Sequence, residues 1–289
     1  MGQRTKAEAL LVVVTLIWGS TFVVVKEALN HTSPLPFLAV RFTLAGLLLF
    51  IWLGRGKLDR QALVPGLVLG IFLFGGFVFQ TWGQNYTTPS KCAFITGFSV
   101  ILVPLITMFY GSQARAGGLL GAVLGLAGIY FLVSPSRLES VNRGDILTLI
   151  GSVSFALHII LVGQYTRRFS FLHLVPVQVL AVALLSIAAL PFDPNRRVDL
   201  TLGLVGAFIF TALFATGFAF SVQNWAQQYT PASHTALIFA LEPVFAAIAS
   251  RIVMGERMGG KVLMGSVLIL GGMVVSEIWG GTTPSPVEG

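Results

Sequence analysis

Charged side chains are scarce in this sequence: Asp, Glu, Lys and Arg make up 10% of its 289 residues, whereas hydrophobic residues make up 55%. That is too little charge to cover the water-facing surface of an ordinary soluble domain. The net charge of +7 forms no basic stripe, because the Lys and Arg residues lie in short loops between apolar runs. This distribution does not favour a nucleic-acid partner. It is typical of cationic residues that flank membrane helices beside lipid headgroups.

Cysteines and catalytic motifs are missing as well. The single cysteine, Cys92, excludes an intramolecular disulfide and a CxxC metal site. The sequence has neither a G-x-x-x-x-G-K-[ST] loop for ATP nor an H-E-x-x-H zinc motif. We therefore predict no catalytic residues, no metal and no cofactor, and an intramembrane enzyme is the disfavoured alternative to a transporter.

Long apolar runs, by contrast, fill the chain, and ten are long enough to cross a bilayer as helices. They are expected at residues 8–26, 35–54, 63–85, 92–111, 116–134, 144–164, 171–190, 201–226, 233–252 and 261–279. The sequence therefore predicts an all-α polytopic membrane protein, with the lipid bilayer as its constant partner.

One motif occurs twice, and this duplication predicts how the helices are organised. Residues 80–87 and 223–230 both read Q-x-W-x-Q-x-Y-T, and residues 93–98 resemble residues 236–241 in the same register. Internal duplication in so apolar a chain is typical of transporters whose two repeats enclose a substrate site.

The repeats are expected at residues 1–135 and 136–280, with a disordered tail at 281–289. Each repeat holds five predicted helices. Because five is an odd number, the second repeat must enter the membrane from the opposite side, so we predict inverted repeats around a central cavity. The cationic residues of the first half favour a cytoplasmic N-terminus, and an even number of spans then places both termini in the cytoplasm.

Small residues predict where helices approach closely. Glycines recur at positions 117, 121, 125 and 128, with Ser266, Gly271 and Gly272 in the matching last helix. Such stripes indicate helix packing within the bundle, with a dimer contact as the alternative.

Three further segments resemble one family: residues 16–22 (LIWGSTF), 39–42 (AVRF) and 241–245 (LEPVF). In order and spacing they are similar to the drug/metabolite transporter superfamily, and most of all to its ten-helix EamA-type exporters. Those include aromatic amino-acid exporters of bacterial inner membranes. The resemblance implies ten helices in two inverted repeats around a central cavity, and an inner-membrane location.

The function that the resemblance implies is secondary transport of a small-molecule substrate. Export of amino acids or related metabolites by alternating access is the first expectation, and aromatic amino acids are included. A drug or a nucleotide sugar is the alternative substrate, and coupling to a proton stays open.

Polar side chains at membrane depth are candidates for substrate binding, because each needs a partner or water there. Gln80 and Gln223 are repeat equivalents whose amides could bind a zwitterion or only link helices. His158 could bind a carboxylate or relay a proton, since imidazole titrates near physiological pH. The alternative for His158 is a neutral ring bonded to a neighbouring helix.

Two charged residues complete the polar candidates. Glu242 precedes Pro243, which removes a backbone donor and breaks the helix. Its carboxylate could bind an ammonium group or a proton, or else pair with Arg251. Arg41 is predicted to extend to the membrane interface, with binding of a substrate carboxylate as the alternative.

Aromatic residues are the remaining candidates. Trp18, which aligns with Phe155 of the second repeat, is expected in the cavity wall, where it could stack on a substrate. Trp82 and Tyr86 come from the duplicated motif and are further substrate-binding candidates. An interfacial aromatic belt is the alternative for Trp82.

Overall fold

A computed structural model describes residues 2–53, 59–108, 116–133, 142–193 and 196–280 of the chain. The described residues are almost entirely helical. The helices are α1 (Gln3–Ala28), α2 (Pro34–Leu53), α3 (Leu63–Gln84), α4 (Pro89–Met108), α5 (Ala116–Val133), α6 (Arg143–Tyr165), α7 (Phe171–Ala189), α8 (Leu202–Phe210), the π-helix η3 (Thr211–Phe218), α9 (Ala219–Ala226), α10 (Ala232–Phe239), α11 (Glu242–Met254) and α12 (Gly260–Gly280). Short 3₁₀ turns, η1 (Arg60–Ala62) and η2 (Leu190–Phe192), precede α3 and follow α7. The predicted tail at 281–289 lies outside the described residues.

Within the described ranges, eight helical segments are long and apolar enough to cross a membrane, which confirms a multi-pass membrane protein. The described apolar parts of α5 and α12 are shorter, residues 120–131 and 260–275, so ten crossings stay a prediction. Large apolar side chains such as Tyr130 and Ile252 point outward from these helices. Outside a bilayer such a surface would aggregate, and inside one it meets lipid tails.

Two expected spans are interrupted in ways that shape the interior. The eighth contains η3, in which the backbone follows a wider π-helical path between α8 and α9. The ninth divides into α10 and α11 at Ala240 and Leu241, just before Pro243. The break beside Pro243 agrees with the expectation, because proline has no N–H to donate to the Phe239 carbonyl. Nothing in the sequence predicted the π-helix.

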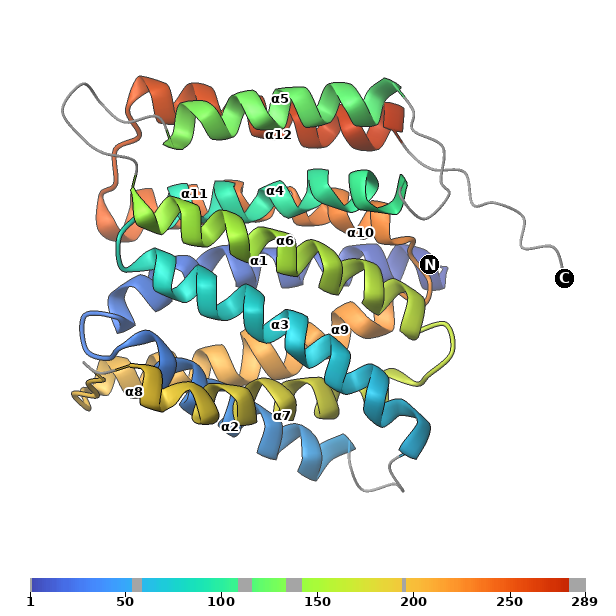
Figure 1. The fold of residues 1–289 in the computed structure, drawn as a ribbon, viewed down its shortest axis with the longest axis vertical. Coiled ribbons are helices and arrows are strands. Elements are labelled where there is room, and N and C mark those ends of the chain that lie inside the picture. The colour runs from blue at the N-terminus through green and yellow to red at the C-terminus, as the bar shows by residue number, and fades with distance from the viewer. Residues whose placement is uncertain (1, 54–58, 109–115, 134–141, 194–195, 281–289) are drawn as a thin grey trace, which may run out of the picture.

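The helices divide into a central group and one outlying pair. In Figure 1, α5 and α12 lie together at one end of the molecule, and α2 and α7 lie at the other. Between them, α3 packs on α6 and α7, α4 packs on α6, and α1 packs on α9 and α11. Trp18 on α1 contacts both large apolar clusters of the interior, so it lies where they meet.

The outlying pair is held by backbone approach. A Cβ added to Gly128 of α5 would lie 2.7 Å from the Gly265 carbonyl oxygen of α12. A Cβ on Gly272 would lie 2.7 Å from the Gly121 carbonyl oxygen. The glycine stripe of α5 therefore packs against α12 of the same chain, as expected for packing within the bundle.

Gly272→Leu is expected to destabilise the protein by about 1–3 kcal/mol, because the added side chain meets the backbone of α5 and cannot be accommodated. Gly271→Leu is the matched control, since a Cβ there would have no atom within 4 Å. The measurement is the thermal unfolding midpoint of each purified variant in detergent. Equal midpoints for the two variants would show that the glycine contact does not hold the pair together.

Candidate functional site

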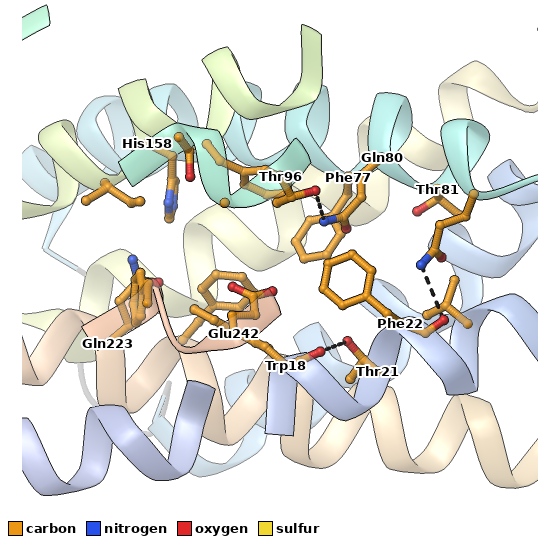
Figure 2. Close-up of a pocket in the computed structure, with 18 of the residues that line it drawn as sticks. Trp18, Thr21, Phe22, Phe77, Gln80, Thr81, Thr96, His158, Gln223 and Glu242 are labelled. Carbon is orange, nitrogen blue, oxygen red and sulfur yellow. Dashed lines mark hydrogen bonds between the residues drawn. The ribbon is translucent and has the colours of Figure 1, made fainter. Parts of the chain in front are cut away.

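A cavity lies at the centre of the helix group (Figure 2). It encloses about 70 Å³ of space that the centre of a water molecule can reach. The lining residues are Trp18, Thr21, Phe22, Val25, Arg41, Phe77, Gln80, Thr81, Gln84, Thr96, Gly97, Ser99, Val100, Phe155, His158, Ile159, Phe220, Gln223, Phe239 and Glu242. They come from α1, α2, α3, α4, α6, α9, α10 and α11, so both halves of the chain build the wall.

Most of the predicted candidates line this cavity, namely Trp18, Gln80, His158, Gln223 and Glu242. Trp82 and Tyr86 do not. Trp82 packs at the edge of an apolar cluster. Tyr86 follows the end of α3 and is 44% exposed, with the Arg143 guanidinium 4.9 Å from its ring centre. The duplicated motif runs past a helix end, so only part of it can face the cavity.

Aromatic rings form one part of the wall. The Trp18 ring lies 5.1 Å from Phe239 and 5.4 Å from Phe220, measured between ring centres. Its indole N–H donates to the Ala215 carbonyl in η3 at 2.9 Å. The Phe77 and Phe155 rings meet edge to face at 5.3 Å. Such rings can pack on an apolar side chain or cover a cation.

The two equivalent glutamines are in different hydrogen-bonding situations. Gln80 donates from Nε2 to Thr96 Oγ1 at 3.1 Å, which links α3 to α4. In the second repeat, Phe239 takes the place of Thr96 in the sequence alignment and offers no hydroxyl. Gln223 therefore turns to Gln227 at 3.2 Å, and its Oε1 is buried without a hydrogen-bond partner among the described residues. The free acceptor of Gln223 is available to a donor group on a ligand.

His158 belongs to a chain of buried hydrogen bonds across α6, α7 and α9. Its Nε2 lies 2.8 Å from Gln178 Oε1, Gln178 Nε2 donates to Asn224 Oδ1, and Asn224 Nδ2 donates to the Phe220 carbonyl. A carbonyl only accepts, so every amide in the chain has a fixed orientation and His158 must donate from Nε2. Sequence reasoning missed Gln178 and Asn224, although an amide inside an apolar helix was a signal for both.

Two opposite charges line the cavity without pairing with each other. The Arg41 side chain is 2% exposed and lies inside the helix group, so the expectation that it extends to the membrane interface is wrong. Glu242 begins α11 at the helix break, and Figure 2 shows its carboxylate pointing into the cavity. Among the described residues, Glu242 makes no side-chain hydrogen bond and no ion pair, so its expected alternative pairing with Arg251 is absent.

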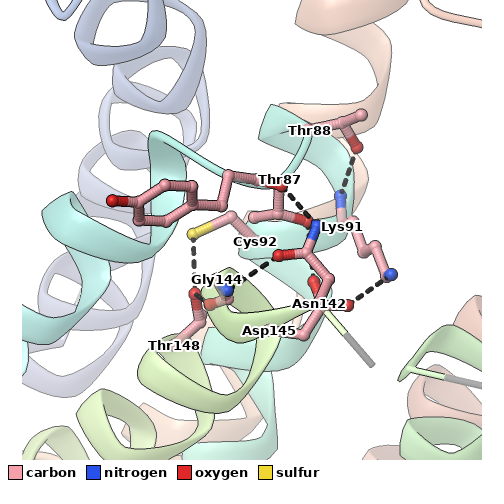
Figure 3. Close-up of polar contacts among 9 residues, drawn as sticks. Thr87, Thr88, Lys91, Cys92, Asn142, Gly144, Asp145 and Thr148 are labelled. Atoms are coloured by element: carbon pink, nitrogen blue, oxygen red, sulfur yellow. Dashed lines mark hydrogen bonds and ion pairs between the residues drawn. The ribbon is translucent and has the colours of Figure 1, made fainter. Parts of the chain in front are cut away.

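Polar contacts join the two halves at one end of the central group (Figure 3). Asp145 at the start of α6 is fully buried, accepts from Thr87 Oγ1 at 2.7 Å, and lies 2.5 Å from Lys91 Nζ. Asn142 donates to the Tyr86 carbonyl and caps α6 by accepting from the Gly144 N–H at 2.8 Å. We call Thr87, Lys91 and Asp145 the latch.

Two more contacts hold helix ends near the latch. Lys26 of α1 donates to the Gln84 carbonyl at 2.5 Å and the Thr87 carbonyl at 3.0 Å, where α3 ends and its carbonyls lack helical donors. Glu256, after α11, accepts from Ser90 Oγ at 2.8 Å. Helices α1, α3, α4, α6 and α11 are therefore tied together at this end.

The repeat equivalents of Asp145, Thr87 and Lys91 are Glu8, Thr230 and His234, respectively. They are arranged differently. Glu8 is partly exposed and pairs within its own helix, 2.8 Å from Arg4 Nε. His234 Nδ1 lies 3.1 Å from Arg4 Nη2, and the buried Thr230 hydroxyl has no partner among the described residues. The contact that is complete at the Asp145 end is thus not formed at the Glu8 end.

The described residues contain no group of three or more His, Cys, Asp or Glu side chains that could hold a metal ion. What the cavity wall offers a ligand is hydrogen-bonding groups, two separate charges and aromatic faces. These are means of binding a small solute.

Proteins with similar sequences include several that are named as transporters. The EamA-like transporter family matches residues 5–134 and again residues 142–277. An uncharacterized transporter of Archaeoglobus fulgidus is 35% identical over 277 residues, which cover 96% of this chain and 87% of that protein. The uncharacterized inner membrane transporter YedA of Escherichia coli is 34% identical over 149 residues, about half of each chain. A crystal structure of a protein that is 19% identical shares the fold, with a TM-score of 0.70 over 94% of this chain and 97% of that one.

Gln178→Leu is expected to destabilise the protein by about 1–3 kcal/mol, because it leaves the His158 N–H and the Asn224 carbonyl buried without partners. Gln164→Leu on the exposed side of α6 is the control with the same chemical change. The thermal unfolding midpoint in detergent measures the difference. A midpoint for Gln178→Leu no lower than that of the control would rule out a stabilising role for the hydrogen-bonded chain.

Proposed function

We propose that this chain, which belongs to the EamA-like transporter family and is a multi-pass membrane transporter, exports amino acids or related small metabolites by alternating access. Aromatic amino acids are the first substrates to test, because Trp18, Phe77 and Phe155 line the cavity. We place it in the inner membrane of a bacterial cell with both termini in the cytoplasm; the relative YedA is named an inner membrane transporter.

The observation that carries this proposal is the unpaired carboxylate of Glu242 in the central cavity. A carboxylate at membrane depth is unfavourable unless a cation or water compensates it. The ammonium group of an amino acid is such a cation. Pro243 has no N–H to donate to the Phe239 carbonyl one turn earlier, and we propose that this carbonyl is a second acceptor for the ammonium group.

A nucleotide sugar fits the cavity less well. Its phosphates require several cationic partners, and Arg41 is the only Lys or Arg among the described residues that line the cavity. A drug-like cation would use Glu242 and the aromatic rings but would leave Arg41 uncompensated. The small volume of the cavity also favours a small solute.

Two related halves are a common basis of alternating access, and we propose that the halves are inverted repeats in which α5 and α12 are the fifth and tenth crossings. The helix pairings support this. The pairing of α3 with α6 corresponds to that of α1 with α9, and the pairing of α4 with α6 corresponds to that of α1 with α11. The pairs α2 with α7 and α5 with α12 each join equivalent helices of the two halves.

The unequal ends support the same mechanism. We propose that the latch keeps the Asp145 end closed in the present state, in which Asp145 pairs with Lys91 and Glu8 pairs with Arg4 of its own helix. In the opposite state Glu8 would release Arg4 and bind Thr230 and His234, as Asp145 binds Thr87 and Lys91. The latch would then open. Exchange between these two contacts would expose the cavity to one side of the membrane at a time.

Purified protein in liposomes is expected to take up radiolabelled amino acids in a saturable manner. Glu242→Gln should lower uptake at low substrate concentration by about tenfold or more, because it removes a charged partner of the ammonium group. Glu27→Gln makes the same chemical change on an exposed side chain and should leave uptake unchanged. Uptake with and without an imposed pH gradient tests proton coupling.

Correctly inserted protein that takes up no amino acid would contradict the proposed substrates and would direct the search to other metabolites or drugs. Equal uptake by wild type and Glu242→Gln would contradict only the proposed role of the Glu242 carboxylate and would leave the proposed substrates in place.

The latch can be tested through the single cysteine of the chain. Cys92 is buried beside the latch, with its sulfur 3.5 Å from Thr148 Oγ1. Asp145→Asn is expected to speed labelling of Cys92 by a water-soluble maleimide about tenfold or more, because breaking a buried ion pair costs about 3–5 kcal/mol. Asp199→Asn breaks the exposed Arg197–Asp199 ion pair and should leave the rate unchanged. A labelling rate for Asp145→Asn equal to wild type would mean that the ion pair does not close this end.

A further inference from the structure

Arg41 is, beside Glu242, the second charge in the described part of the cavity wall that has no ion-pair partner. Its side chain is 2% exposed, and it is among the largest fully buried side chains of the protein. It comes from α2, whereas the other charge in the wall, Glu242, comes from α11. No carboxylate of a described residue lies within ion-pair distance of it.

The contacts of Arg41 leave part of its guanidinium without partners. Nε donates to Thr216 Oγ1 in η3 at 2.9 Å. The guanidinium carbon lies 4.7 Å from the centre of the Phe77 ring and 5.2 Å from that of Phe42. Nη2 is buried and has no hydrogen-bond partner among the described residues. One hydrogen bond and two ring faces hold the group in place, but they do not neutralise it.

Such an arrangement is unfavourable for the empty protein. A buried cation without an anion costs several kcal/mol, and an unsatisfied N–H adds to that cost. A contact that only linked α2 to η3 would need no charge. The planar guanidinium, by contrast, presents parallel N–H groups that match the two oxygens of a carboxylate.

We propose that Arg41 binds the carboxylate of the transported solute, while Glu242 binds its ammonium group. This inference rests on the proposed function and narrows it: the substrates carry both a free carboxylate and a free amine, and Arg41 selects for the carboxylate. The π-helix engages only one nitrogen of the guanidinium: Thr216 accepts from Nε, and Nη2 is left without a partner among the described residues. Trp18 is bonded to the adjacent carbonyl of Ala215, so the aromatic wall and the arginine are held by the same segment.

The test compares three probes that differ only in their charged groups. Phenylalanine carries both groups, phenethylamine lacks the carboxylate, and 3-phenylpropanoate lacks the amine. Binding of each to the purified full chain is measured by calorimetry in detergent or nanodiscs. Wild type is expected to bind phenylalanine about tenfold or more tightly than either of the other probes.

The variants assign the two preferences to two residues. Arg41→Gln should lose the preference for phenylalanine over phenethylamine and keep the preference over 3-phenylpropanoate. Glu242→Gln should lose the preference for phenylalanine over 3-phenylpropanoate and keep the preference over phenethylamine. Arg41→Lys keeps the positive charge but lacks the two parallel N–H groups, so it should retain part of the preference for phenylalanine over phenethylamine. Because it keeps the charge, Arg41→Lys also serves as the test variant if Arg41→Gln does not fold.

Two controls separate binding from a structural role. Thr216→Val removes only the hydrogen bond that holds Nε, and it should leave the preference for the carboxylate largely intact. Arg167→Gln removes an exposed arginine and should change nothing. If Arg41→Gln and Thr216→Val weaken all three probes equally, Arg41 is only a link between helices and the proposal is overturned.

The remaining outcomes separate this inference from the proposed function. A wild-type preference for phenylalanine over phenethylamine of less than threefold would overturn the carboxylate site while leaving amino-acid transport in place. Arg41-dependent binding of 3-phenylpropanoate, with no binding of phenylalanine, would keep the site and overturn amino-acid transport. Folded wild-type protein that binds none of the three probes would overturn both.

Discussion

Lipid tails offer no hydrogen bonds, and this constraint determines the rest of the structure. Backbone groups must find partners within their own segment, so the chain forms helices. Polar side chains must find partners or turn inward, as the chain from His158 through Gln178 to Asn224 does. Among the buried side-chain atoms that have no hydrogen-bond partner in the described residues, two, the Arg41 Nη2 and the Gln223 Oε1, belong to residues that line the central cavity. In a membrane protein this is where a solute can complete them.

The sequence predicted the broad architecture because that architecture depends on composition and order. Apolar length predicted the eight spans that the described helices confirm, and Pro243 predicted the break in the ninth expected span. Arg41 was misjudged because its position along the helix indicates its depth but not the direction in which its side chain points. The π-helix could not be predicted, because it makes tertiary hydrogen bonds: its Ala215 carbonyl accepts from Trp18, and its Thr216 hydroxyl accepts from Arg41. Trp82 and Tyr86 share a motif with Gln80, yet a motif that crosses a helix end cannot face one cavity throughout.

The differences between the repeats are as informative as their similarity. Where the first half has Thr96 the second has Phe239, so one glutamine is bonded to a neighbouring helix and its equivalent is left with a free acceptor. Where the first half has Lys91 the second has His234. A duplicated half provides the scaffold, and single replacements of this kind give equivalent side chains of the two halves different hydrogen-bond partners.

The pairing of α5 with α12 also has a consequence for how the protein is made. Helix α5 completes the first half, whereas α12 is synthesised after all the other described helices of the second half. The glycine face of α5 therefore has no partner while the whole second half is being synthesised and inserted. Assembly of the first half cannot be finished by the first half alone, and a chain that stops before α12 would leave that face to lipid or to the proteins that survey unassembled helices.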